Sequence, residues 1–294
     1  MNKNVVLILA SGTLWGFMGL FTRFMGRLGF SSAGTVIVRC GVACIMFGIT
    51  LLLRDRKLFR IRFRDLWCFL GAGLCSLLFF TFCYFQAIRL TSLAAAAILL
   101  YTAPSMVMIM SLFIFKEKMT APKTAALIMA FAGCCLVSGL GSGKLSLSPA
   151  GLIYGLCAGF GYALYSIFAR LAMDRGYNSL TINFYSCLLA AAGAAVIWGP
   201  AEPVTLLFSG WKPLLLGLTM GGISCYLPYL MYTRGLASVE AGRASIMASV
   251  EPVVAALSGI IVFREKLTVT GALGILLVLG AIAVLNIPSG KTRT

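Results

Sequence analysis

One acidic side chain lies deep inside an apolar run of the chain. Glu251 occurs in Ser249-Val-Glu251-Pro252-Val, near the middle of the apolar stretch 241–262. If this stretch crosses a membrane, an ionised carboxyl group there costs about 3 kcal/mol or more, unless it faces protein or water or is protonated. Glu251 is therefore a candidate contact for a substrate amine and a candidate proton-coupling site. The structural alternative is that it satisfies backbone groups left unpaired beside Pro252.

Arg39 is the second charge at depth, seven residues into the apolar stretch that begins at Ser32. Its long aliphatic stem could carry the guanidinium to the membrane surface. We favour this arrangement, or a structural ion pair, over a contact with substrate.

The groups that most enzymes require are missing. The chain has no histidine, and therefore lacks the commonest metal ligand and general base. Its aspartates lie at the ends of apolar runs, no two acids share a helix face inside a run, and no phosphate-binding G-x-x-x-x-G-K-[ST] loop occurs. The ten cysteines lie in apolar runs without a C-x-x-C pair, which favours small buried side chains. We therefore predict no catalytic residue, no metal and no cofactor.

Two prolines occupy equivalent positions in apolar runs. Pro104 and Pro252 each remove one helical hydrogen bond, which membrane helices tolerate where neighbours or cavity water satisfy the freed carbonyl. We predict hinges at these residues; packing without movement is the alternative. Pro228 has no such counterpart, because Phe80 occupies its equivalent position.

Aromatic residues also occur within the apolar runs rather than only at their ends. A buried tyrosine hydroxyl requires a partner, so several of them could line a moderately polar cavity. Helix packing or a place at the headgroups is the simpler explanation for any single tyrosine. Together with Glu251, the predicted substrate-binding residues are Trp15, Tyr84, Tyr101, Tyr162, Tyr229 and Ser249.

The runs that carry these residues form an internal repeat. The segment from Ile98 through Pro104 to Thr120 returns 148 residues later, from Ile246 through Pro252 to Thr268. The start of the chain repeats as well, since Gly12-Thr-Leu-Trp15 corresponds to Gly159-Phe-Gly-Tyr162. Each copy has five apolar runs, so the second copy must enter the membrane from the opposite side. Inverted repeats of this kind are an architecture of secondary transporters.

Length and composition fit this organisation. At 60% hydrophobic residues the 294-residue chain is too apolar for a soluble domain. Runs of about 20 apolar residues are long enough to cross a bilayer. We predict an all-α integral membrane protein of ten helices, in two five-helix repeats at residues 1–141 and 149–290. The predicted spans are 5–25, 32–53, 66–87, 92–115, 121–140, 150–173, 180–199, 213–236, 241–262 and 267–287.

The basic residues predict the orientation. With the N-terminus inside, sixteen of the 24 Lys and Arg residues fall on the inner side and seven on the outer side, with Arg39 within a span. This asymmetry is the positive-inside rule, and it places both termini in the cytoplasm. The densest cluster, Arg54–Arg64, is interpreted as an anchor at anionic headgroups. No nucleic-acid recognition module surrounds it, so no nucleic-acid partner is predicted despite the net charge of +16.

Together these motifs resemble the EamA-type branch of the drug/metabolite transporter superfamily. The resemblance is carried by Leu14-Trp15-Gly-Phe, by Thr102-Ala-Pro104 followed by Phe-Lys-Glu117-Lys, and by Ser249-Val-Glu251-Pro252 followed by Phe-Arg-Glu265-Lys. It implies a basket with a substrate cavity between the first, third, fourth, sixth, eighth and ninth helices, in a bacterial inner membrane. It also implies that Glu117 and Glu265 are structural charges at helix ends. Members move amino acids, other small metabolites or drugs, often outward.

The resulting hypothesis is an alternating-access carrier, and an exporter by resemblance, for a small amino-acid-like or aromatic metabolite. The expected partners are this solute, the lipid bilayer and, if Glu251 couples transport, protons; a monomer is expected. A lipid flippase or a non-transport membrane protein is the alternative. A membrane-embedded enzyme is a weaker one, because no cluster of aspartates lies at a membrane surface.

Overall fold

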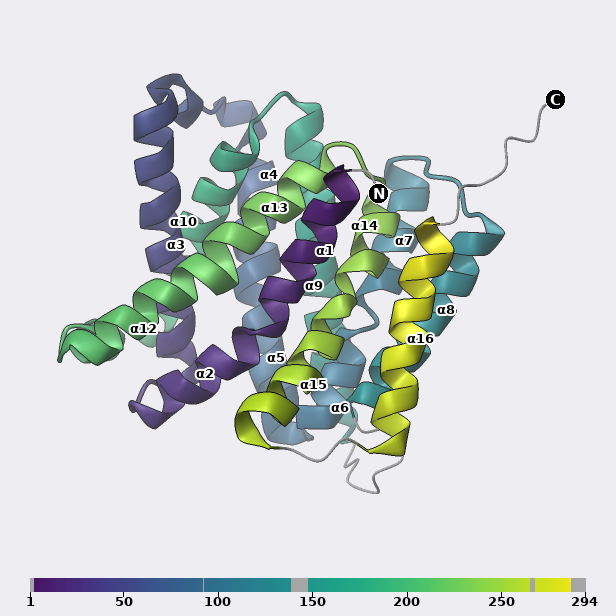
Figure 1. Ribbon diagram of the computed structural model, residues 1–294. Coiled ribbons are helices and arrows are strands. Elements are labelled where there is room, and N and C mark those ends of the chain that lie inside the picture. Colours follow the sequence, from purple (N-terminus) through teal and green to yellow (C-terminus); the bar gives the residue numbers. More distant parts are fainter. Residues whose placement is uncertain (1–2, 92, 139–147, 265–267, 287–294) are drawn as a thin grey trace.

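The protein is a bundle of helices. The computed structural model describes residues 3–91, 93–138, 148–264 and 268–286, which contain helices and connections and no strand (Figure 1). Nine stretches of these residues are long and apolar enough to cross a membrane. The predicted fifth span, 121–140, is represented by the shorter apolar helix α8 (Ala121–Val137), and its last two residues lie outside the described part.

The first repeat contains α1 (Lys3–Gly16) and α2 (Met18–Arg27) in its first span and α3 (Ser32–Arg54) in its second. The third span consists of α4 (Leu66–Leu70), a π-helical segment (Gly71–Leu78) and α5 (Phe79–Leu90). Two short 3-10 turns, Arg56–Phe59 and Phe63–Asp65, precede it. The fourth span consists of α6 (Leu93–Leu100) and α7 (Ala103–Ile114).

The second repeat begins with α9 (Pro149–Asp174) and α10 (Ser179–Trp198), followed by the short α11 (Ala201–Leu207), which the apolar pattern did not predict. The eighth span consists of α12 (Trp211–Gly221), a π-helical segment (Gly222–Tyr226) and α13 (Leu227–Leu236). The ninth consists of α14 (Ala241–Ala248) and α15 (Val250–Phe263), and α16 (Val269–Asn286) is the last.

Several helices begin where the sequence supplies a cap. The side chains of Ser31 and Ser148 accept hydrogen bonds of 3.0 Å from the N–H groups of Gly34 and Gly151, at the starts of α3 and α9. Asn178 accepts one of 2.9 Å from Leu180 at the start of α10. These caps satisfy N–H groups that have no partner within the helix.

The two predicted proline sites lie at interruptions of the fourth and ninth spans. Pro104 is the second residue of α7, and Pro252 is the third residue of α15. A proline is tolerated in a first turn because its missing N–H would have no helical partner there. Each proline thus begins the second half of a broken span.

The carbonyl groups opposite these prolines face glycines of other spans. The carbonyl of Ala248, four residues before Pro252, lies 2.9 Å from where a Cβ of Gly12 in α1 would be. The carbonyl of Leu100, four residues before Pro104, lies 3.4 Å from the equivalent point of Gly159 in α9. Both breaks are therefore covered by a close-packed glycine from the other repeat.

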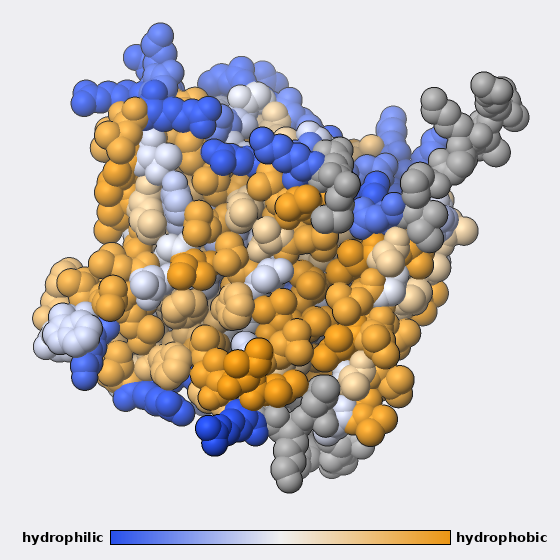
Figure 2. Space-filling view, in the orientation of Figure 1, coloured by the Kyte–Doolittle hydropathy of each residue, from blue (hydrophilic) through white to orange (hydrophobic). Residues whose placement is uncertain are grey.

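The outer surface of the bundle fits a bilayer. Figure 2 shows a broad apolar band between hydrophilic residues at the two ends of the molecule. Large apolar side chains in this surface are strongly exposed, for example Val196 at 86% and Val269 at 78%. Such a surface would be unfavourable in water. With its many apolar spans, the chain is a multi-pass membrane protein. The start of α1 and the end of α16 lie at the same end of the bundle (Figure 1).

Polar contacts fasten the loops at that end. Asp65 is 6% exposed and forms ion pairs of 3.1 Å with Arg62 and with Arg175, which follows α9. The hydroxyl of Tyr177 donates a 2.8 Å hydrogen bond to the same carboxylate. This cluster joins the basic loop before α4 to the end of α9, across the two repeats.

The helices α8 and α16 pack side by side, with their backbones in direct contact. A Cβ added to Gly274 would lie 2.6 Å from the carbonyl oxygen of Gly133, and one added to Gly133 would lie 2.7 Å from that of Gly274. Glycines at such a contact let two membrane helices approach closely.

This contact predicts that Gly274→Ala destabilises the protein. The added methyl group meets backbone that cannot move aside, and overpacking typically costs about 1–3 kcal/mol. Gly41→Ala in α3 is the matched control, because nothing lies within 4 Å of its Cβ position. It should be neutral or stabilise by about 0.5–1 kcal/mol through helix preference alone. Thermal unfolding in detergent measures both; equal melting temperatures would contradict the prediction.

Candidate functional site

A cavity lies between the two repeats, where their aromatic residues meet. About 360 Å³ of space free of atoms lies between these residues, a volume that includes open solvent. Its walls come from α1, the third span, α9, α13 and α14. The lining residues are Trp15, Ser76, Leu77, Phe80, Tyr162, Tyr165, Ser166, Tyr229, Tyr232, Ser245 and Ala248.

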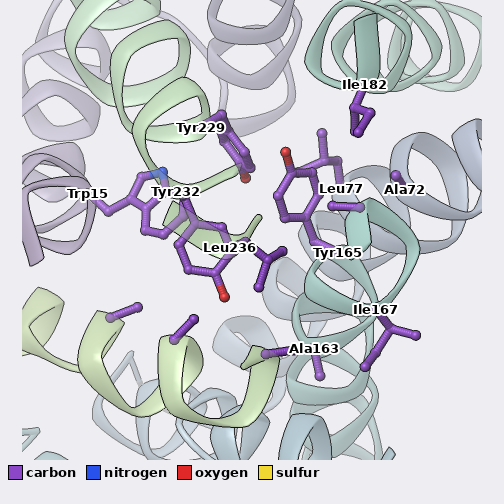
Figure 3. Close-up of a cluster of buried hydrophobic side chains, with 14 of the residues drawn as sticks. Trp15, Ala72, Leu77, Ala163, Tyr165, Ile167, Ile182, Tyr229, Tyr232 and Leu236 are labelled. Carbon is purple, nitrogen blue, oxygen red and sulfur yellow. The ribbon is translucent and has the colours of Figure 1, made fainter. Parts of the chain in front are cut away.

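Trp15 is the centre of the aromatic wall. Its ring centroid lies 5.1 Å from that of Tyr229, 5.3 Å from that of Tyr232 and 6.5 Å from that of Tyr162. Tyr165 packs edge-on against Tyr229 at 4.8 Å. Figure 3 shows the rings of Trp15, Tyr165, Tyr229 and Tyr232 close to one another. Edge-to-face packing at such distances is favourable beyond simple burial, so the wall is held in shape before any solute enters.

Tight packing fixes Trp15 in place. Gly12 and Gly16 lie on one face of α1, and a Cβ at Gly16 would meet Val254 and the carbonyl of Glu251 within 2.9 Å. The helix α1 thus lies against the break of the ninth span. Because α1 ends at Gly16, the indole of Trp15 is in its last turn.

A buried polar network supports the tyrosines from behind. The hydroxyl of Tyr165 donates to the side-chain oxygen of Asn183, which is fully buried in α10. The amide nitrogen of Asn183 donates to the Thr233 hydroxyl at 3.0 Å and to the Tyr229 carbonyl at 3.3 Å. Two further lining residues also contact each other, because the hydroxyls of Ser166 and Tyr232 lie 2.7 Å apart. The network ties α9, α10 and α13 into one unit.

Two polar atoms of the lining have no hydrogen-bond partner among the residues that the structure describes. The Nε1 atom of Trp15 and the Oγ atom of Ser76 are both buried and unpaired, on side chains that are 7% and 1% exposed. A buried polar atom without a partner costs about 1–3 kcal/mol. Such groups beside an open cavity are available to hydrogen-bond a solute.

Glu251 lies beside this cavity, although it is not among its lining residues. The carboxylate is half-buried in the first turn of α15, and Tyr162 donates a 3.1 Å hydrogen bond to it. Since Tyr162 itself lines the cavity, it connects the carboxylate with the aromatic wall. No ion pair of Glu251 occurs within the described part of the chain.

The chain matches the EamA-like transporter family twice, over residues 2–139 and 149–287. It belongs to the EamA-like transporter family. The resemblance read from the motifs is thereby confirmed, and the protein is a membrane transporter. Among its relatives is an uncharacterized transporter of Archaeoglobus fulgidus, 26% identical over 282 residues, which cover 95% of this chain and 96% of that protein.

Two further similarities extend over nearly the whole of this EamA-like transporter. The uncharacterized inner membrane transporter YicL of Salmonella typhimurium is 21% identical over 294 residues, covering 99% of this chain and 97% of YicL. A crystal structure covers 96% of both chains with a TM-score of 0.80 at 19% identity. At that identity the likeness is one of fold.

The structure brings some of the predicted binding residues of this EamA-like transporter together and separates others. Trp15, Tyr162 and Tyr229 line the cavity. Tyr84 lies one layer behind, against Phe80 at 5.9 Å. Tyr101 packs against the cluster of Cys134, Val253 and Val278, away from the lining, and Ser249 lies at the break between α14 and α15. No residue of the fourth span lines the cavity, unlike the arrangement that the resemblance implied.

The predicted structural charges fall in different surroundings. The Glu117 carboxylate accepts hydrogen bonds from the N–H groups of Ala241 at 2.7 Å and Gly242 at 3.3 Å, and so caps the start of α14. Glu265 lies outside the described residues. Arg39 is only 4% exposed, so its head is not at the surface, and no described carboxylate pairs with it.

Sequence reasoning had not selected Asn183 or Ser76 for the site. An amide in the middle of an apolar span is itself a signal, because membrane helices rarely hold one without a partner. Ser76 and Ser224 are equivalent in the repeat, yet only Ser76 lines the cavity, and the sequence contains nothing that separates them.

The network predicts strong coupling between Tyr165 and Asn183. Either Asn183→Leu or Tyr165→Phe should lower stability, by about 1–3 kcal/mol where a buried polar group is left unpaired. The double variant should lose less than the sum of the two, because the hydrogen bond can be lost only once. Thermal unfolding of the four proteins measures this. Additive losses would show that the two side chains act independently.

Proposed function

We propose that the protein is a secondary-active transporter that moves small metabolites, such as amino acids or related compounds, outward by alternating access. The observation that carries this proposal is the aromatic cavity, whose walls come from both repeats and which lies against the broken ninth span. Transporter sites typically lie between repeats, beside interrupted helices.

The chemistry of the cavity supports a small, partly apolar solute. Aromatic rings form most of the wall, and the unpaired Nε1 of Trp15 and Oγ of Ser76 could each hydrogen-bond a solute. Glu251 adds a carboxylate, to which the described part of the chain donates one hydrogen bond, from Tyr162. A carboxylate in such a place can hold either an ammonium group or a proton.

The interrupted spans are the proposed moving parts. The fourth and ninth spans break beside Pro104 and Pro252, and the third and eighth contain π-helical segments. By the 148-residue offset, Gly222–Tyr226 overlaps the equivalent of the first π-helical segment. Such segments have weaker helical hydrogen bonding and occur often at functional sites. We infer that both copies bend at these points in turn.

We further propose that the repeats, 1–141 and 149–290, have inverted topology, that the chain acts as a monomer in a bacterial inner membrane, and that both termini are cytoplasmic. The distribution of basic residues supports this orientation. The common end of the bundle for the start of α1 and the end of α16 is consistent with it.

If Glu251 couples transport to protons, Glu251→Gln should abolish the effect of an imposed pH gradient on solute flux in proteoliposomes. The described groups within electrostatic range of Glu251 are Tyr84, Tyr101, Cys134, Tyr162 and Arg39. Glu202→Gln is the control, since that carboxylate is exposed and bonds Ser31 at 3.0 Å. Flux that responds equally to the gradient in both variants would remove Glu251 from coupling. Absence of flux for every solute tested, with lipid movement instead, would favour a flippase.

Substitution of Pro104 and Pro252 tests whether these residues act as hinges. Pro104→Ala and Pro252→Ala each add an N–H that can bond the carbonyl four residues before only when the broken span straightens, and this bond would favour the straight form by about 1 kcal/mol. If bending limits transport, the rate should change about fivefold while expression stays normal. Pro149→Ala, at the first position of the unbroken α9, is the control. Unchanged rates in both hinge variants would exclude these prolines from the mechanism.

A further inference from the structure

Arg39 carries a buried charge for which the described protein offers no counter-ion. The side chain is 4% exposed in the middle of α3, and its Nε atom has no hydrogen-bond partner. Its Nη1 atom contacts the sulfur of Met18. Among the described residues, no carboxylate lies within ion-pair distance of the guanidinium.

The surroundings of the guanidinium cannot replace a counter-ion. The ionisable groups close to it are the thiols of Cys40, Cys187 and Cys225 and the phenol of Tyr229, and Glu251 interacts with it only beyond ion-pair distance. These groups are neutral at ordinary pH and are weak acceptors. Removing a charge from water carries an effective cost of several kcal/mol unless a good partner compensates it. A buried arginine that serves stability alone would be expected to have such a partner.

The guanidinium interacts with a residue of the cavity wall, although Arg39 is not itself a lining residue. Met18, which it contacts, follows the break between α1 and α2, three residues after Trp15. Tyr229, which interacts with Arg39 electrostatically, lines the cavity and packs against Trp15. Another residue of the aromatic wall, Tyr162, donates a hydrogen bond to the carboxylate of Glu251, which is within electrostatic range of Arg39. A cation therefore interacts with one residue of the cavity wall and an anion with another.

We propose that Arg39 is the anion-recognition residue of this cavity, and that it binds a carboxylate group of the transported solute. This proposal rests on the proposed transport function and deepens it. A guanidinium can hold a carboxylate through two parallel hydrogen bonds. The solute then supplies the counter-ion that the ligand-free protein lacks. Glu251 would bind an ammonium group of the same solute. The solute class is therefore a zwitterion with an apolar or aromatic side chain.

The first test is the stability of the ligand-free protein. If the charge is uncompensated, Arg39→Met should leave the melting temperature unchanged or raise it, because an apolar side chain of similar length avoids the desolvation cost. Arg243→Met is the matched control. Arg243 lies in the ninth span, and its Nη2 donates to the Leu285 carbonyl at 2.6 Å and to the Asn286 side chain at 3.3 Å. That variant should lower the melting temperature.

The second test is thermal stabilisation of the purified full-length protein by matched probes. L-phenylalanine and L-leucine have carboxylates. Phenethylamine and isoamylamine lack them, and 3-phenylpropionate and 4-methylpentanoate lack the ammonium group instead. A bound solute raises the melting temperature by an amount that grows with affinity and concentration. We expect the amino acids to stabilise the wild type and the amines not to. In Arg39→Met, at least tenfold more amino acid should be needed for the same rise in melting temperature. Arg39→Lys should need a concentration between those of the wild type and Arg39→Met.

Three results would overturn the proposal. The first is a loss of ligand-free stability in Arg39→Met as large as that in Arg243→Met. The second is stabilisation by the amines equal to that by the amino acids. The third is no response of the wild type to any carboxylate-bearing probe. Flux assays with neutral or cationic solutes separate these outcomes from failure of the transport proposal. Flux of such a solute would leave transport standing while removing the role of Arg39.

Discussion

The close approach of two glycines to two broken helices is the constraint on which the rest of this structure depends. Gly12 lies against the Ala248 carbonyl, and Gly159 lies against the Leu100 carbonyl. Each carbonyl is one that a proline four residues later leaves without its helical partner. A side chain at either glycine would push the helices apart and expose a polar group to an apolar surrounding. The breaks and the glycines therefore stabilise one another across the two repeats.

This contact also determines where the aromatic wall forms. Trp15 follows Gly12 by three residues, and Tyr162 follows Gly159 by three, so each ring lies on nearly the same face of its helix as the glycine. The first and sixth spans thus present their rings beside the broken ninth span from two directions. The Asn183 network then fixes Tyr165 and α13 behind them. Because these supports are buried hydrogen bonds and ring contacts, the wall exists without a solute.

The sequence predicts the frame of this protein far better than its site. Apolar runs, prolines and the 148-residue repeat located the spans to within a few residues, because bilayer thickness and the missing N–H of proline act locally. Tyr84 and Tyr101 are predicted for the same reason as Tyr162, and all three lie within electrostatic range of Glu251, but only Tyr162 of the three lines the cavity. A residue's direction around a helix depends on how neighbouring helices pack. The break at Phe17, between α1 and α2, has no proline to announce it.

The repeats share their packing but not the charges inside their spans. Glycine and proline recur at equivalent positions, whereas the counterpart of Glu251 is Ala103, and 148 residues after Arg39 the chain has Cys187. A charge in a membrane interior costs free energy. A structural role common to both repeats would not explain why each of these charges occurs in only one repeat. Each charge instead interacts with a residue that lines a single cavity, Arg39 with Tyr229 and Glu251 with Tyr162. A symmetric frame can open to either side, but one solute bound in it has distinct ends and requires distinct partners. A protein built from two similar repeats therefore needs residues that occur in only one repeat, such as Arg39 and Glu251, to recognise a solute whose two ends differ.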